Sequence, residues 1–268
     1  MTLEISPDGM QEIEWSRAGA VVRLNLDRPE RRNAITRTML SELLWAVEAC
    51  SDDESVRVVV IQGNGKGFCA GDELRGMGDV PADFPFRPRA AVTHAALQAA
   101  LRGMAKPTIA AIHGFAFGVG LDLAMACDLR IAAEDAQLRD QRVIDRGMHA
   151  VTGCAWFQPR AIGITRALEF LVLGKPYTGT EAAAAGMVTI AVPAAELEGA
   201  VNELTGRLAE APTRAIGLMK RQIYEGLEMG HAEFMAFAQP LIRDVVIEDR
   251  AEGIQAFLER RPPKFTGR

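Results

Sequence analysis

Short apolar runs alternate with longer amphipathic segments along most of the chain. The runs at 56–61 and 108–112 are rich in branched apolar residues and predict strands buried on both faces. Segments 12–17 and 21–26 are separated by a short glycine-containing turn and predict a β-hairpin. The other elements predicted here are helices over 36–50, 90–104 and 120–127, a short helix near Glu73, short strands over 129–132 and 136–138, and a proline-rich loop over 78–88.

The pattern changes near Pro193, after which the chain is almost entirely helical. The helices predicted there cover 194–209, 213–227, 231–246 and 248–260. We therefore predict an α/β core over 1–192 and a C-terminal helical region over 193–268. A single continuous core without this boundary is the alternative.

Composition narrows the class of protein without indicating its activity. The chain has 268 residues, a formal net charge of −5 and a sequence pI of about 5.5, which provides no general attraction for nucleic acid or anionic membranes. The first eleven residues are polar and acidic, unlike a signal peptide, and no apolar run approaches the ~18 residues of a membrane span. The four cysteines form no CxxC pair, which favours buried thiols in a reducing compartment. We expect a cytoplasmic protein without nucleic-acid or membrane partners.

Two glycine-rich turns, at 63–71 and 114–120, follow the two predicted buried strands, and each is predicted to open a helix. Glycine lets the backbone approach a ligand closely, and the first N–H groups of a helix have no partner inside it. Two such turns brought together could direct two N–H groups at one oxygen. That arrangement is an oxyanion hole, which suits chemistry on a carbonyl or thioester.

Other classes of enzyme fit these residues poorly. A dinucleotide fingerprint belongs on the first strand of its fold, whereas this glycine-rich turn lies in mid-chain, and the chain has no Tyr-x-x-x-Lys pair. All five serines stand at or before Ser55 and none lies in GxSxG. Cysteine–histidine catalysis would require Cys69 or Cys127, each in an apolar stretch. The four histidines are far apart and form no ligand motif, so no metal is expected.

Acidic residues near the second turn are the main candidates for acid–base chemistry. Asp122 lies in the first turn of the predicted helix 120–127, where it is either a helix N-terminal acid or a base beside the oxyanion. Asp140 and Asp145 belong to a charged cluster over 139–146, which is either a solvated, salt-bridged loop or a second part of the site.

Five segments, in order along the chain, resemble signatures of the crotonase, or enoyl-CoA hydratase/isomerase, superfamily. They are LDRPERRNA at 26–34, GNGKGFCAGDEL at 63–74, KPTIAAIHGFAFGVGLDLAMACD at 106–128, GKPYTGTEAAAAGMV at 174–188 and FLERRPPKFTGR at 257–268. The resemblance implies a spiral of ββα repeats followed by a helical trimerisation region, assembled as a homotrimer or a dimer of trimers. It also implies an acyl-CoA thioester as substrate and no cofactor apart from the coenzyme A that the substrate carries.

The resemblance also implies roles for particular residues. The two oxyanion donors fall on the backbone N–H groups of Asp72 and Val119, and the first catalytic carboxylate of the hydratases falls on Asp122. The second carboxylate falls on Arg142.

No glutamate replaces this second carboxylate. Asp140 and Asp145 are therefore candidates for its role, and His149 is a further catalytic candidate.

Coenzyme A carries phosphates, so basic residues are its candidate contacts. By resemblance, Arg28, Arg31, Arg32 and Ala70 belong to its pantetheine and phosphate neighbourhood, and Lys264 approaches the nucleotide, in relatives often from a neighbouring subunit. The alternative for each basic residue is ordinary surface charge.

Hydration or isomerisation of an enoyl-CoA, with Asp122 as the main acid/base, is the reaction that these residues favour. Thioester hydrolysis or C–C cleavage using His149 or Asp145 is an alternative. A relative that binds acyl-CoA and has lost catalysis is another.

Overall fold

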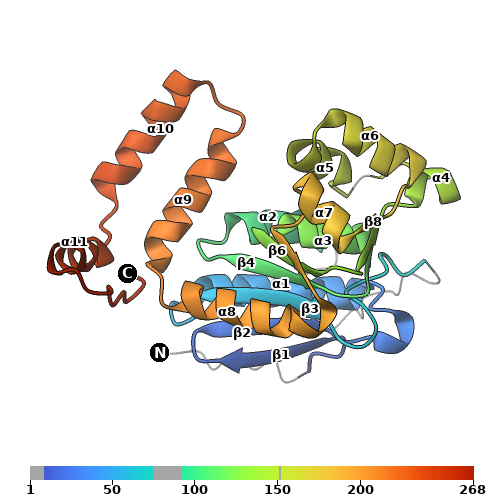
Figure 1. Ribbon diagram of the computed structural model, residues 1–268, viewed down its shortest axis with the longest axis horizontal. Coiled ribbons are helices and arrows are strands. Elements are labelled where there is room, and N and C mark those ends of the chain that lie inside the picture. The colour runs from blue at the N-terminus through green and yellow to red at the C-terminus, as the bar shows by residue number, and fades with distance from the viewer. Residues whose placement is uncertain (1–8, 75–91, 151) are drawn as a thin grey trace.

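A computed structural model describes residues 9–74, 92–150 and 152–268 (Figure 1). A six-stranded sheet has the strand order β1-β2-β3-β4-β6-β9, and a smaller sheet has the order β5-β7-β8. The strands of the first sheet are β1 (Ile13–Ala18), β2 (Val21–Leu26), β3 (Val58–Gly63), β4 (Thr108–Ile112), β6 (Leu129–Ala133) and β9 (Ile190–Val192), and those of the second are β5 (Phe115–Phe117), β7 (Gln137–Arg139) and β8 (Tyr177–Thr178). The β1–β2 pair is the predicted hairpin and is antiparallel, whereas β2, β3, β4, β6 and β9 run parallel.

The two sheets arise from a repeat that places one strand in each sheet before a helix. Strand β4 enters the first sheet, β5 enters the second, and α3 (Val119–Ala126) comes next. Strands β6 and β7 repeat the pattern before α4 (Arg142–Arg146). The α/β class and the spiral of ββα units are therefore confirmed.

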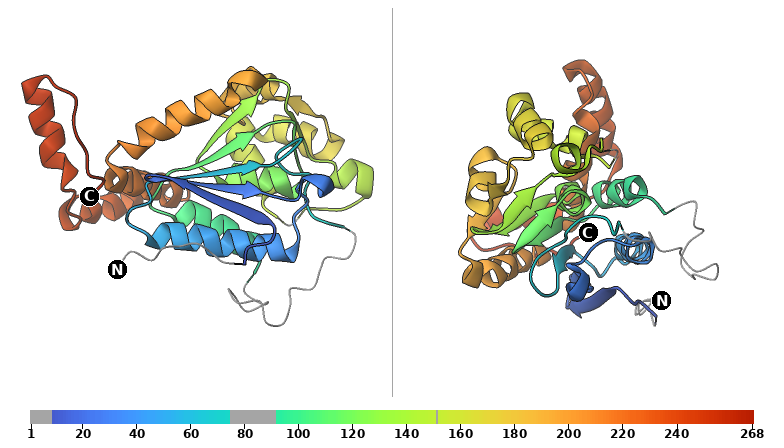
Figure 2. Two further views of the ribbon diagram at one scale, coloured as in Figure 1. Left: turned by 90° about the horizontal axis from the view of Figure 1, so that it is seen from below. Right: turned by 90° about the vertical axis from the view of Figure 1, so that its right-hand side faces the viewer.

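Helices cover both faces of the six-stranded sheet. Helix α1 (Arg37–Asp52) begins at Thr36, whose hydroxyl accepts the N–H of Met39, and its apolar face packs on β1 and β2. Helix α8 (Leu197–Ala209) lies on the opposite face, against β3 and β6 (Figure 2). The remaining helices are η1 (Pro29–Arg31), α2 (His94–Gly103), α5 (Cys154–Ile162), α6 (Ile164–Leu173), α7 (Gly179–Ala185), η3 (Ala194–Glu196), α9 (Thr213–Gly226), α10 (His231–Asp244) and α11 (Asp249–Glu259).

The C-terminal region is helical as predicted. Its first long helix, α8, packs on the sheet, whereas α9, α10 and α11 extend to one side of the body (Figure 1). The boundary near Pro193 stays a prediction. Over the described ranges, no helix has the length and apolar character needed to cross a membrane.

The prediction of a helix after the first glycine turn was wrong for the described residues. The first glycine turn leads into extended chain, in which Cys69 bridges Ala116 and Asp72 bridges Ile35, and no helix is present up to residue 74. The second turn opens a helix as predicted, α3, and also contains a strand, β5, because glycines on either side of the strand let the backbone bend sharply. The predicted loop over 78–88 lies outside the described residues.

Helix α9 is anchored to the body by a buried ammonium group. Lys220 Nζ donates to the carbonyl oxygen of Leu101 at 2.7 Å and to Asp128 Oδ2 at 2.8 Å. Tyr224 donates to the other oxygen of Asp128 at 2.8 Å. Burial lowers the pKa of Lys220, and the Asp128 carboxylate opposes that effect.

We expect Lys220→Met to lower the free energy of unfolding by about 3–5 kcal/mol, because it leaves a buried carboxylate without its cation. Urea unfolding followed by circular dichroism measures the change. Lys175→Met is the matched control, since Lys175 forms an exposed pair with Glu169 and should contribute almost nothing. Equal, small losses in the two variants would contradict this prediction.

Candidate active site

The first candidate oxyanion donor is the amide of Asp72, in the extended segment after the first glycine turn. The N–H of Ile35 donates to the carbonyl oxygen of Gly71 at 2.8 Å, and the N–H of Glu73 donates to the carbonyl oxygen of Ile35 at 2.9 Å. Successive peptide groups of an extended chain point to opposite sides, so the N–H of Asp72 points away from Ile35. Within the described ranges this N–H donates no hydrogen bond.

The second candidate donor is the amide of Val119, the first residue of α3. Its N–H has no acceptor in the preceding turn, as at any helix start. The left-handed conformation falls on Gly118, with φ 51°, so a β-branched residue fits at 119 without strain. A Cβ added at Gly71 would lie 3.6 Å from the Val119 nitrogen, so glycine at position 71 leaves the space beside this nitrogen free of a side chain. The fold thus brings both candidate amides to one place.

Asp122 lies one turn beyond Val119 and is completely buried. Its Oδ2 accepts from Arg142 Nη1 at 3.0 Å and from the Thr152 hydroxyl at 2.6 Å. Its Oδ1 has no hydrogen-bond partner in the described part of the chain. Burial raises the pKa of Asp122 to about 6, against the opposing effect of the Arg142 guanidinium. This carboxyl group can therefore gain or lose a proton near neutral pH.

Arg142 stands between two carboxylates. Besides Asp122, it binds Asp140, with Nε 3.0 Å from Oδ1 and 3.2 Å from Oδ2. The arginine is 8% exposed and Asp140 is 2% exposed. Hydrogen bonds to both carboxylates raise the pKa of Arg142, so it stays charged. The charged cluster at 139–146 is thus partly a buried network, and of the two alternatives the solvated loop does not hold for Asp140 and Arg142.

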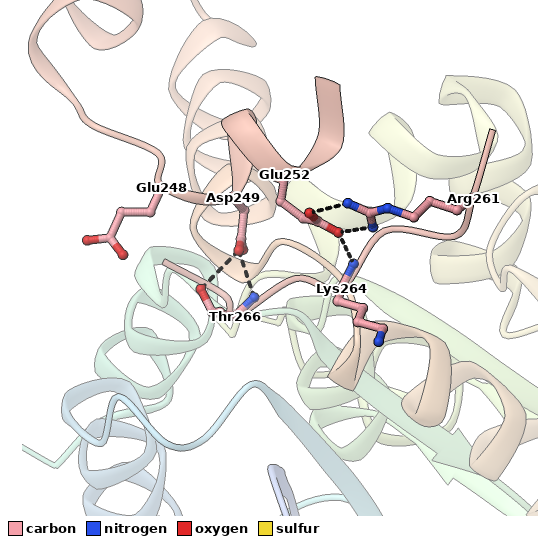
Figure 3. A pocket seen from close by; sticks show the side chains of 6 residues that line it. All are labelled: Glu248, Asp249, Glu252, Arg261, Lys264 and Thr266. Carbon is pink, nitrogen blue, oxygen red and sulfur yellow. Dashed lines mark hydrogen bonds and ion pairs between the residues drawn. The ribbon is translucent and has the colours of Figure 1, made fainter. Parts of the chain in front are cut away.

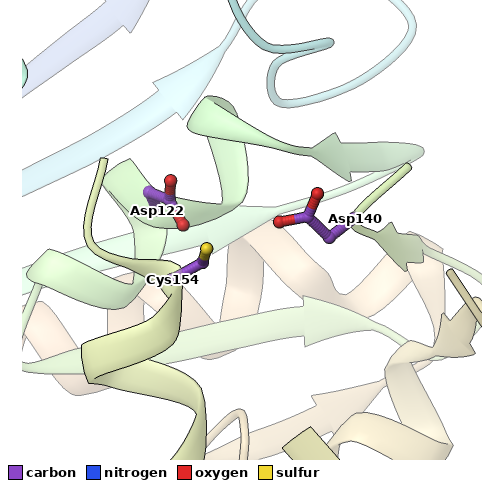
Figure 4. Close-up of side chains that lie close together, drawn as sticks. All are labelled: Asp122, Asp140 and Cys154. Atoms are coloured by element: carbon purple, nitrogen blue, oxygen red, sulfur yellow. The ribbon is translucent and has the colours of Figure 1, made fainter. Parts of the chain in front are cut away.

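Asp122, Asp140 and Cys154 lie close enough to share one ligand, with oxygen and sulfur atoms within 4.8 Å of one another (Figure 4). Arg142 binds both carboxylates, so a cation is already present. Burial raises the pKa of the Cys154 thiol to about 12, and a protonated thiol is a poor ligand. The chemistry of these donors therefore does not suit a metal ion.

Two other catalytic candidates lie apart from this network. Asp145 is on the outside of α4, where it pairs with Arg139 at 3.0 Å. His149 is exposed in the segment after α4. The structure brings neither into contact with Asp122.

The side chain of Asp72 has a partner that sequence reasoning missed. His94 Nε2, on the first residue of α2, lies 3.0 Å from Asp72 Oδ1. Both residues line a cavity of about 180 Å³, together with Ile35, Thr36, Arg37, Leu40, Val92 and Thr93. No sequence signal pairs two residues that lie on separate elements, so the sequence alone assigns His94 no role.

The candidate coenzyme A contacts near the first signature differ in exposure. Arg28 is largely buried, donates to the carbonyl oxygen of Ala34 at 2.7 Å and pairs with Glu12 at 3.1 Å. Arg31 and Arg32 are exposed on η1 and just after it. The N–H of Ala70 donates to the carbonyl oxygen of Arg32 at 3.0 Å, which ties this arginine to the first glycine turn.

Lys264 lies in the C-terminal tail and is bonded to Glu252 of α11. Helix α11 is at the opposite end of the molecule's long axis from α4, whose Arg142 binds Asp122 (Figure 1). Glu252 accepts the N–H of Lys264 at 2.7 Å and pairs with Arg261, and these bonds lower the pKa of Glu252 to about 2. These residues line a pocket of about 450 Å³ with Glu248, Asp249 and Thr266 (Figure 3). Within one chain Lys264 therefore lies far from Asp122.

Comparisons with known proteins agree with the fold. A family profile described as Enoyl-CoA hydratase/isomerase matches residues 16–268. The chain is 36% identical to the mitochondrial enoyl-CoA hydratase domain-containing protein 2 of Mus musculus, over 92% of this chain and 85% of that protein. It is 33% identical to the 2,3-dehydroadipyl-CoA hydratase of Escherichia coli, over 97% of this chain and all of that protein. A solved structure of an enoyl-CoA hydratase from Bacillus anthracis superposes with a TM-score of 0.86 at 29% identity, covering 96% of this chain and all of that one.

Proposed function

Because the chain belongs to the enoyl-CoA hydratase/isomerase family, we propose that it hydrates or isomerises an enoyl-CoA thioester, with Asp122 as the main acid/base. The observation that carries this proposal is the spacing on α3. The amide of Val119 starts the helix and the carboxyl of Asp122 lies one turn later. When the thioester oxygen binds the amide of Val119, the titratable carboxyl group of Asp122 therefore lies near the α-carbon of the same thioester.

The proposed chemistry passes through an enolate. The amides of Asp72 and Val119 hydrogen-bond to the thioester oxygen more strongly as negative charge develops on it, which lowers the barrier. Asp122 exchanges a proton with the adjacent carbon, and its unpartnered Oδ1 is the atom available for the transfer. A pKa of about 6 suits this role, since the group is then neither a strong acid nor a very weak base at neutral pH.

Arg142 has a supporting role in this proposal. It stays positively charged, so it cannot act as the second carboxylate of a hydratase. It can hold Asp122 in one orientation through its Nη1 and through Thr152. Coenzyme A enters only as part of the substrate, and no separate cofactor is proposed.

The test is an assay with crotonyl-CoA and with its β,γ-unsaturated isomer. Loss or gain of the conjugated enoyl-thioester absorbance reports hydration or isomerisation, and mass spectrometry separates the two products. Turnover of either ester supports the proposal. Binding of both esters without turnover would support the alternative of a catalytically impaired acyl-CoA-binding protein.

The other crotonase reactions are less favoured by the geometry. Thioester hydrolysis or C–C cleavage through Asp145 or His149 would use groups that are exposed and do not contact Asp122. Release of free coenzyme A, detected with a thiol reagent, would indicate hydrolysis. If Asp145→Asn abolished that release, this alternative would replace the proposal.

Assembly into a homotrimer, or a dimer of trimers, is part of the proposal. Helices α6, α9 and α11 carry large apolar side chains on their outer faces, which a single chain leaves in water. The exposed residues are Ile164, Leu168, Val172, Leu173, Met219, Ile223, Ile254, Phe257 and Leu258. Coenzyme A contact by Lys264 would then come from a neighbouring copy, since α11, to which Lys264 is bonded, lies far from α4, whose Arg142 binds Asp122 (Figure 1).

We expect the double variant Phe257→Arg, Leu258→Arg to sediment as a smaller species than the wild-type protein, because the two side chains are 82% and 70% exposed in one chain. Analytical ultracentrifugation measures the change. Arg250→Ala, an exposed change on the same helix, is the control and should leave the assembly intact. A wild-type protein that sediments as a monomer would contradict this prediction.

A further inference from the structure

Hydration, one of the reactions under the proposed function, requires two proton movements. The attacking water must lose a proton as its oxygen bonds C3, and C2 must gain one. Asp122 can serve one of these steps. Arg142 is a cation and cannot accept a proton, and both oxygens of Asp140 accept hydrogen bonds from Arg142. Neither of these two neighbours of Asp122 is therefore suited to the second proton movement.

Helix α2 lies across this site. His94 and Gln98 are one turn apart and share a face of the helix. His94 pairs with Asp72, whose amide is one oxyanion donor. Gln98 donates to the carbonyl oxygen of Thr152 at 2.7 Å, and the Thr152 hydroxyl donates to Asp122. One face of α2 is thus connected to both ends of the site.

The imidazole of His94 is held through one ring nitrogen by the Asp72 carboxylate. Its Nε2 lies 3.0 Å from Asp72 Oδ1, so the carboxylate favours a hydrogen on that nitrogen. The tautomer that this bond favours leaves a lone pair on Nδ1, which makes no hydrogen bond in the described part of the chain.

The cavity beside His94 has room for reactants. Its volume of about 180 Å³ far exceeds the cavity volume of ~10–15 Å³ that is needed to hold one water molecule. Its described walls combine apolar side chains with three charged or titratable ones, namely Asp72, His94 and Arg37 at the start of α1. Asp72 therefore lines this cavity with its side chain, and its backbone N–H belongs to the proposed oxyanion hole.

We propose that His94 is the base that takes a proton from the attacking water, and that the Asp72 carboxylate positions it. The water oxygen bonds to C3, the π electrons move onto the thioester oxygen, and Nδ1 of His94 takes the proton from the water. C2 then takes the proton held by Asp122. The product is a 3-hydroxyacyl-CoA, and the extra proton on His94 returns through solvent to the Asp122 carboxylate.

The test compares two reactions that share the oxyanion hole. Hydration of crotonyl-CoA needs both proton-transfer groups, whereas exchange of the α-protons of butyryl-CoA in D₂O needs Asp122 and the hole alone. His94→Gln retains an N–H that can donate to Asp72 but cannot accept the proton. We expect it to lower the rate of hydration by about 10²–10³-fold and to leave the exchange close to wild type.

Two further variants sharpen this test. Asp72→Asn retains the backbone N–H of the hole and removes the carboxylate, so it should also lower the rate of hydration. His231→Gln changes an exposed histidine at the start of α10 and should leave both reactions unchanged.

Each other outcome overturns one of the two proposals. Equal losses of hydration and exchange in His94→Gln would show a structural role, and unchanged hydration would show no role, so either result overturns the inference about His94. A wild-type protein that exchanges α-protons without hydrating crotonyl-CoA would also overturn it, while the proposed enolate chemistry would stand. A wild-type protein that neither exchanges α-protons nor converts an enoyl-CoA would overturn the proposed function itself.

Discussion

Asp122→Asn should lower kcat for the enoyl-CoA reaction by about 10²–10⁴-fold and leave the affinity for an acyl-CoA ester close to wild type. The amide still accepts hydrogen bonds from Arg142 and Thr152 through its oxygen, so the surroundings are preserved. It has no carboxyl group to carry the proton. Steady-state kinetics and calorimetric titration with a saturated acyl-CoA measure the two effects.

The same residue should determine how α-proton exchange depends on pH. Exchange begins with removal of a proton, which requires ionised Asp122. Burial raises the pKa of Asp122 to about 6, so the exchange rate should rise as the pH increases through that value and then level off. Asp135→Asn, an exposed change in the turn before β7, is the control and should alter neither kcat nor the pH profile. Retention of wild-type kcat in Asp122→Asn would exclude Asp122 as the acid/base.

Val119→Pro should lower kcat/KM by about 10²–10³-fold, which corresponds to ~3–4 kcal/mol of transition-state stabilisation for one oxyanion donor. Proline has no N–H, so the substitution removes the proposed donor. The first position of a helix is where proline is best tolerated, and Val119 occupies that position in α3. The helix should therefore form, and the melting temperature should show only a small change.

Val119→Ala is the matched control for this variant. It removes two methyl groups and retains the N–H, so its kcat/KM should stay near that of the wild-type protein. Equal activities in the proline and alanine variants would mean that the amide of Val119 does not bind the thioester oxygen. A large loss in both would indicate that the valine side chain, not the amide, is the group that the site requires.

The elements that the sequence predicted well are those in which local pattern and final packing agree. Strands β2 and β4 have the predicted bounds, 21–26 and 108–112, because apolar residues fill most of their length. The helix expected near Glu73 is absent from the described residues. Glycine signals a bend without specifying the conformation of the residues beyond it, and here the chain after Gly71 is held extended by Ile35, which is distant in sequence.

Asp72, Val119 and Asp122 entered the candidate site through backbone pattern and resemblance, and their roles stay predictions. Arg142 was recognised only as the residue in place of a carboxylate. Its burial depends on Asp122, twenty positions away in the chain, and such pairing over long separation leaves no periodic signal. The pairing of His94 with Asp72 could not be predicted from the sequence for the same reason.

Arg142 also determines how much charge the interior must tolerate during turnover. With Asp122 ionised, Arg142 and its two carboxylate partners carry a total charge of −1. When Asp122 takes a proton from the substrate, this negative charge migrates to the thioester oxygen at the start of α3, and the total stays the same. The migration runs toward the positive end of the helix dipole. Since no charge is created or lost inside the protein, the intrinsic rate of this step should be nearly insensitive to ionic strength.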